Sequence, residues 1–195
     1  MIEHVDEGDA ILYMKIGTHA TEPLDDIIAR KKQEISDAGF SMWGYGGNTC
    51  HPRTTVQPFA SSHAAEGRVI RLLMQPMHSN HFADPVPADE YSVDGLRWLP
   101  VPAGIEVRGS RFALCIRNLE QVHWKLPLEA TRVAIGNCRG RRGSLYIKGR
   151  VDKACLEVVG SYDLESVSSA GPVAEIGLVA ELIKPYSVLL RSDQE

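Results

Sequence analysis

The sequence predicts a single α+β domain with a mixed or antiparallel β-sheet and one long amphipathic helix near the N-terminus. Three observations favour this class. Residues 10–17 are typical of a strand, residues 24–35 carry an apolar stripe with helical spacing, and several later segments alternate apolar and polar residues. The 195 residues suit one domain, and 17 Gly with 11 Pro favour many turns and short strands over a helical bundle.

The first predicted elements are a strand and the long helix. Residues 10–17 read AILYMKIG, a run with β-branched and aromatic side chains that ends in glycine. For the helix, Thr21 is the expected N-cap and Pro23 lies in the first turn. Gly39 is the expected left-handed residue that ends it. One helical face gathers the apolar residues Leu24, Ile27, Ile28 and Ile35.

The later predicted elements are shorter, and most of them are strands. Residues 40–63 hold too many glycines and prolines for a long regular element, but a short helix is expected at about 57–66. Residues 78–96 are rich in Asp, Pro, Ser and Asn, which predicts a long loop, a candidate lid or insertion. Strands are expected at 68–77, 104–107, 111–117, 132–135, 144–151 and 154–159, with a final strand pair or short helix at 173–190.

This order of elements resembles, in outline, the pseudouridine-synthase-associated (PUA-like) folds. The resemblance rests on the order of the elements and on no motif of the chain. It implies a sheet curled into a small barrel, with the long helix packed against it.

Composition and the N-terminal residues bear on location and redox state. No apolar run approaches the roughly 20 residues that cross a bilayer, so no membrane span is expected. The first residues, MIEHVDEGDA, are acidic and lack the positive start of a secretory signal. The protein is therefore expected in the cytoplasm, with its four widely spaced cysteines as free thiols. They form no CxxC pair, and the pattern predicts neither a zinc site nor a cofactor.

Charge is distributed unevenly along the chain. The formal net charge is −4, yet residues 132–153 hold seven basic residues and one acidic residue, a local charge of +6. The rest of the chain therefore carries −10. Such segregation predicts a local anion-binding face on an acidic body. A solvated surface hairpin is the alternative.

An aromatic and glycine-rich segment, MWGYGGNTCHP at residues 42–52, is the first candidate site. Trp43 and Tyr45 alternate with glycines, so the backbone can bend sharply and approach a ligand. On such a loop two aromatic rings can sandwich a base, and Asn48 can add a polar contact. The alternative is that both rings fill the core beneath the helix. The segment matches neither a Walker phosphate loop nor a Rossmann fingerprint.

Cys50 and His51 are weaker candidates for the nucleophile or base of an enzyme. A thiolate nucleophile needs a base within about 3 Å, which usually comes from another part of the fold. The available histidines include His19, His63 and His123. A structural role for Cys50 is the alternative.

A metal site is the weakest candidate. His78, His81 and Asp84 form the pattern HxxHxxD, whose imidazole and carboxylate groups are ligands that zinc accepts. The spacing places both histidines on one face only in a helix, and Pro85 and Pro87 argue against a helix there. Exposed loop histidines are the alternative.

Together these features predict a module that binds a nucleotide or a nucleic acid. Trp43 and Tyr45 would stack a base while a basic hairpin holds phosphate. The expected phosphate ligands are Arg139, Arg141, Arg142, Lys148 and Arg150. Two alternatives stay open. One is an enzyme that acts on a nucleotide or phosphorylated substrate through Cys50 and His51, and the other is a protein-interaction module, such as a small inhibitor or adaptor, that contacts a protein partner or a second copy.

Overall fold

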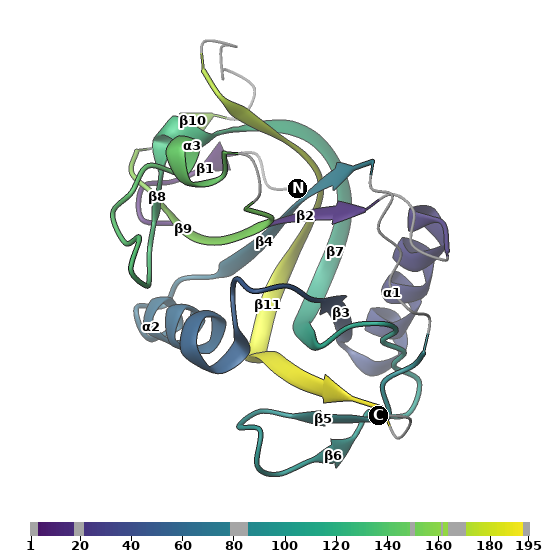
Figure 1. Cartoon of the computed structure of the whole chain (residues 1–195). Coiled ribbons are helices and arrows are strands. Elements are labelled where there is room, and N and C mark those ends of the chain that lie inside the picture. The colour runs from purple at the N-terminus through teal and green to yellow at the C-terminus, as the bar shows by residue number, and fades with distance from the viewer. Residues whose placement is uncertain are drawn as a thin grey trace.

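The computed structural model describes residues 4–17, 22–78, 86–148, 151–160, 162–163 and 171–192, and within them the fold is α+β (Figure 1). The helical elements are α1 (Leu24–Ala38), η1 (Pro52–Val56), α2 (Gln57–Ala65), η2 (Leu128–Ala130) and α3 (Gly143–Tyr146). The strands are β1 (His4–Val5), β2 (Ala10–Gly17), β3 (Ser41–Tyr45), β4 (Ile70–Met77), β5 (Glu90–Ser92), β6 (Leu99–Pro100), β7 (Phe112–Pro127), β8 (Thr131–Val133), β9 (Lys153–Val158), β10 (Tyr162–Asp163) and β11 (Val173–Arg191).

The main sheet is mixed. Its strands follow the order β3-β7-β11-β4-β2-β9-β8, and β5 and β6 extend it from β11. Among the described strands, β2 and β4 pair in parallel and the other pairs are antiparallel. The order ends at β3 and β8, which do not pair with each other, so the sheet is not closed into a barrel. The expected barrel and PUA-like outline are therefore not confirmed.

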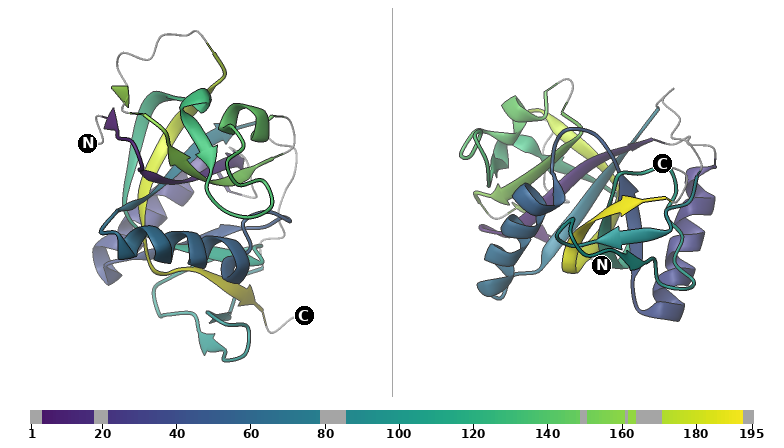
Figure 2. Two further views of the ribbon diagram at one scale, coloured as in Figure 1. Left: turned by 90° about the vertical axis from the view of Figure 1, so that its left-hand side faces the viewer. Right: turned by 60° about the horizontal axis from the view of Figure 1, so that its bottom comes forward.

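Side chains of β2 are buried on both faces of the sheet. Leu12 and Met14 contact a core cluster that includes residues of α1 and α2. Ile11 and Tyr13 belong to a second cluster on the opposite face, next to α3 and η2. In the right-hand view of Figure 2, α1 and α2 flank the strands that lie between them. The two helices thus frame one face of the sheet, and the candidate site lies on that face.

The predicted helix is confirmed, and so is its end. Gly39 adopts φ 80°, and its N–H donates to the Ile35 carbonyl at 2.9 Å. The expected apolar face packs on the core through Leu24, Ile27, Ile28 and Ile35. Pro23 occupies the N-cap position, and no side chain caps that end. Thr21, the expected cap, lies outside the described residues.

Several predicted segments differ from the structure, and the strand expected at 104–107 is wrong, because those residues form a turn and irregular backbone. Residues 41–45, expected within an irregular loop, form β3, because they pair with residues 112–116 of β7. The strand expected at 144–151 is wrong in its first part, where Gly143–Tyr146 form α3. There Ser144 donates a hydrogen bond to Glu129 at 2.6 Å, and the Ile147 N–H donates to the Gly143 carbonyl at 2.8 Å. These contacts replace the pairing that a strand would need.

The long loop expected at 78–96 contains regular structure near its end. Residues 90–92 form β5, which pairs with residues 189–191 of β11 and with β6. Residues 79–85 lie outside the described part of the chain. The final segment, expected as a strand pair or short helix, is one long strand, β11, between β7 and β4.

Candidate functional site

A cavity of about 250 Å³ lies between α1, the end of β2, β3 and the segment 106–110. Trp43 and Tyr45 of β3 line it, with Gly44 and Gly46 beside them. Lys153, the first residue of β9, lines the same cavity. The structure therefore brings the aromatic segment and one residue of the basic segment to a common hollow.

Trp43 and Tyr45 lie on a strand and are buried, with exposed fractions of 6% and 5%. Their expected position on an open loop is wrong, because β3 pairs with β7 and directs both side chains into the core beneath α1. The Tyr45 hydroxyl donates to the Cys50 carbonyl at 2.7 Å and lies 2.7 Å from the Ser187 hydroxyl. Burial raises the pKa of Tyr45, so the phenol stays neutral. Both residues line the cavity, so a ligand there could contact them along one of its walls.

Two glycines shape the wall around these rings. A Cβ at Gly44 would lie 2.4 Å from the Ser110 hydroxyl oxygen, so only glycine lets β3 approach the 106–110 segment this closely. Gly47 has φ 93°, a left-handed conformation that side chains rarely adopt. A Cβ at Gly47 would lie 3.4 Å from the Lys153 ammonium. The glycine-rich loop therefore runs directly beside the lysine.

Lys153 is the most unusual charged residue of the cavity. It is 8% exposed, and in the part of the chain that the structure describes no hydrogen bond or ion pair reaches its ammonium group. The Tyr45 ring centroid lies 6.0 Å away, at the edge of the cation–π range. Its strand neighbour across the ladder is Met14, which offers no charge. A largely buried lysine without a described counter-ion favours an anionic ligand in the cavity that it lines.

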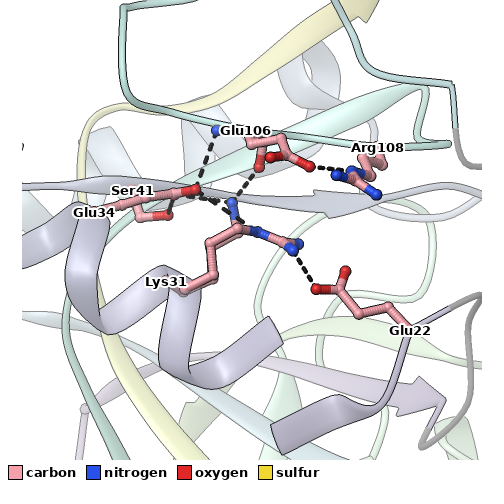
Figure 3. Close-up of polar contacts among 7 residues, drawn as sticks. Glu22, Lys31, Glu34, Ser41, Glu106 and Arg108 are labelled. Atoms are coloured by element: carbon pink, nitrogen blue, oxygen red, sulfur yellow. Dashed lines mark hydrogen bonds and ion pairs between the residues drawn. The ribbon is translucent and has the colours of Figure 1, made fainter. Parts of the chain in front are cut away.

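The other cations of the cavity have partners. Figure 3 shows Lys31 of α1 directed at Glu34 and at the carbonyl of Glu106. The Lys31 ammonium lies 2.9 Å from the Glu34 carboxylate, which also accepts hydrogen bonds from the Ser41 hydroxyl and the Glu106 N–H. Burial lowers the pKa of Lys31, and Glu34 opposes that shift. The pairs Arg30–Glu22 and Arg108–Glu106 complete the wall.

The cavity wall is positive as a whole. Five basic side chains and two acidic side chains line it. Carboxylates hold Arg30, Lys31 and Arg108, and Lys15 is engaged in an interaction as well, whereas Lys153 has no described counter-ion. The wall therefore favours a ligand that carries negative charge.

A second hollow of about 280 Å³ lies on the other side of the glycine-rich loop. Asn48, Cys50 and His51 line it together with Cys155 of β9 and Tyr146 of α3. Among the sequence candidates, Asn48 therefore lies apart from Trp43 and Tyr45.

The histidines expected to serve Cys50 are placed elsewhere or are occupied. His63 is bound to the Phe59 carbonyl and to Glu157, each at 2.9 Å. His123 lies on β7, and His19 is outside the described residues. The Nδ1 atom of His51 is buried without a hydrogen-bond partner among the described residues. An enzymatic use of Cys50 and His51 stays a prediction.

The basic segment is exposed and lies away from the first cavity. Arg139, Arg141, Arg142 and Lys148 are exposed, and they are not among the residues that line the hollow at Trp43. Arg142 lies 3.5 Å from Glu129. Arg150 falls outside the described residues. A phosphate-binding role for this group stays a prediction.

The metal candidates cannot be joined into a site. His78 is described, whereas His81 and Asp84 lie outside the described residues. In the described ranges, no group of three or more His, Cys, Asp and Glu side chains is arranged to hold a metal ion. Nor does any helix in those ranges have the length and apolar character that spanning a membrane requires.

Sequence reasoning placed Lys153 in the basic segment but did not identify it as part of the site. A signal was present, because alternate side chains of a strand point to the same face, which places Lys153 and Cys155 together. The sequence alone does not show which residues pack against that face of the strand.

The chain matches no protein-family model, and neither a curated protein nor a solved structure matches it.

Proposed function

We propose that the protein binds a small anionic ligand with a planar group, of the nucleotide class, in the cavity beside Trp43. The observation that carries the proposal is the largely buried Lys153 side chain, which lines the cavity and whose ammonium has no described counter-ion. An anionic group of the ligand would supply that counter-ion. The indole edge of Trp43 would contact the planar part.

The size of the cavity favours a small molecule over a nucleic-acid strand. About 250 Å³ is close to the lower end of the roughly 300–1,000 Å³ that is usual for ligand pockets. A strand of several nucleotides would need an extended groove lined by successive aromatic rings. Trp43 and Tyr45 instead meet at one enclosed hollow.

Calorimetric titration with mononucleotides and with inorganic phosphate tests the proposal. Lys153→Met removes the charge and keeps much of the volume. Since a charge-assisted hydrogen bond contributes about 1.5–3 kcal/mol, the dissociation constant should rise about tenfold to a hundredfold. Lys32→Met is the matched control, because Lys32 is exposed on α1 and does not line the cavity, so this change should leave affinity unchanged.

Two outcomes would contradict the proposal. Equal affinity of folded Lys153→Met and wild type would remove Lys153 from the site. Absence of binding by every nucleotide and by phosphate would exclude the nucleotide class. Calorimetry on the variant Trp43→Phe separates the ring contact from the charge contact. The affinity for nucleotides should fall, whereas the affinity for inorganic phosphate should stay unchanged.

A further inference from the structure

The hollow on the far side of the glycine-rich loop contains a pair of thiols that the proposed ligand site does not use. Cys50 belongs to the loop between β3 and η1, and Cys155 belongs to β9. Both are buried, and both line the hollow of about 280 Å³. After burial, Cys50 is the group that most affects the Cys155 thiol. Two thiols from distant parts of the chain thus lie beside one hollow, close enough to interact.

The backbone at Cys50 is held in an unusual conformation. Its φ of 57° is left-handed, a region that residues with a Cβ enter at an energetic cost. Contacts on both sides fix it there. The Tyr45 hydroxyl donates to the Cys50 carbonyl, and the carbonyl of His51 accepts the N–H groups of Thr55 and Val56 at the start of the helix. In this conformation Cys50 lines the hollow that Cys155 also lines.

The surroundings suit a disulfide better than a metal ion. No group of three ligands capable of holding a metal occurs in the described part of the chain, so the thiols are not part of such a set. All four cysteines are free. Cys138 also lines the hollow and provides an internal comparison, whereas Cys115 is buried elsewhere, in the core beside Met42.

We propose that Cys50 and Cys155 form a reversible disulfide when a hydroperoxide, such as hydrogen peroxide, enters this hollow. The Cys50 sulfur loses its proton and attacks peroxide, an S–O bond forms, the O–O bond breaks, and one water leaves. The Cys155 sulfur then attacks the sulfenic sulfur, the S–O bond breaks, and hydroxide leaves with the Cys155 proton as a second water. Two thiols and one hydrogen peroxide give one disulfide and two waters.

We assign the first step to Cys50 because it lies on the loop that borders the hollow, whereas Cys155 lies in a strand of the sheet. Burial, together with its interaction with Cys50, raises the pKa of Cys155 well above its ordinary value, so Cys155 carries little thiolate. Cys155 is then the resolving thiol, and it lines the same hollow.

The test is peroxide treatment of the reduced full-length protein, a denaturing alkylation quench, and mass spectrometry. The expected result is an intact mass lower by two hydrogens, loss of alkylation at two of the four cysteines, and a peptide crosslink between Cys50 and Cys155. Dithiothreitol should reverse all three changes. Cys50→Ser and Cys155→Ser should each abolish the crosslink, while Cys138→Ser should keep it.

The wild-type peptide map decides the question even where a variant fails to fold. A crosslink that includes Cys138 would overturn the proposal. So would full alkylation of Cys50 and Cys155 after peroxide treatment of protein whose circular dichroism is native. The outcome is independent of nucleotide binding, because the assay contains no nucleotide.

Discussion

Gly44→Ala tests the close approach of β3 to the segment that forms one cavity wall. The added Cβ would lie 2.4 Å from the Ser110 oxygen, 2.9 Å from the Ser110 Cβ and 3.1 Å from a Val107 methyl carbon. Overpacking of this kind costs about 1–3 kcal/mol. With a urea m-value of about 2 kcal/mol/M, the unfolding midpoint should fall by about 0.5–1.5 M.

Two further variants separate this contact from a general effect of alanine. Ser110→Gly removes both atoms that lie closer than 3 Å, so in the double variant Gly44→Ala should cost much less. The resulting coupling energy should be about 1–3 kcal/mol. Gly46→Ala is the matched control, because a Cβ there meets nothing within 4 Å. Additive effects of the two substitutions in urea unfolding, or equal losses at positions 44 and 46, would refute the steric reasoning.

Three other perturbations have expected outcomes, each measured by urea unfolding. Lys31→Met removes the closer of the two cations beside the buried Glu34 carboxylate and should lower the free energy of unfolding by about 3–5 kcal/mol, so a loss below about 1 kcal/mol would contradict the role of the pair. Tyr45→Phe removes the hydroxyl beside Ser187 and should cost about 1–3 kcal/mol; an unchanged midpoint would count against this bond. Burial raises the pKa of Cys115 from 9.0 to about 12. The protonated thiol therefore contributes to the free energy of unfolding below pH 9, and this contribution is lost as the pH rises toward 12. Between pH 8 and pH 10 the wild type should therefore lose about 1.4 kcal/mol more of its free energy of unfolding than Cys115→Ala loses.

The sequence predicted those helices and strands that are determined by residues close together in the chain. The strand at 10–17 and the helix that ends at Gly39 follow from periodicity and from a residue that tolerates a left-handed backbone. Strand β3 could not be predicted in this way. Its pairing partner, β7, begins about 70 residues later, and its glycine is required by Ser110, which is equally distant.

The candidate site depended on the same long-range information. The aromatic segment and the basic segment were both recognisable, but only the order of the strands decides which of their residues meet. Lys153 reaches the cavity because β9 pairs with β2, beneath the glycine-rich loop. The prediction of a strand at 144–151 was wrong because a hydrogen bond from Ser144 to Glu129 stabilises a short helix there. The residues next to Ser144 in the sequence do not reveal that contact.

The position of β11 has a consequence for synthesis of the protein. This strand lies between β7 and β4 in the sheet, and its side chains enter all three core clusters. Because β11 is made last, β4 and β7 leave the ribosome with one edge each unpaired. At about 5–20 residues per second, the 114 residues from the end of β4 to the end of β11 take on the order of ten seconds. Once β7 is made, within that interval, the nascent chain exposes the unpaired backbone edges of two strands, which can pair with other chains until β11 covers them.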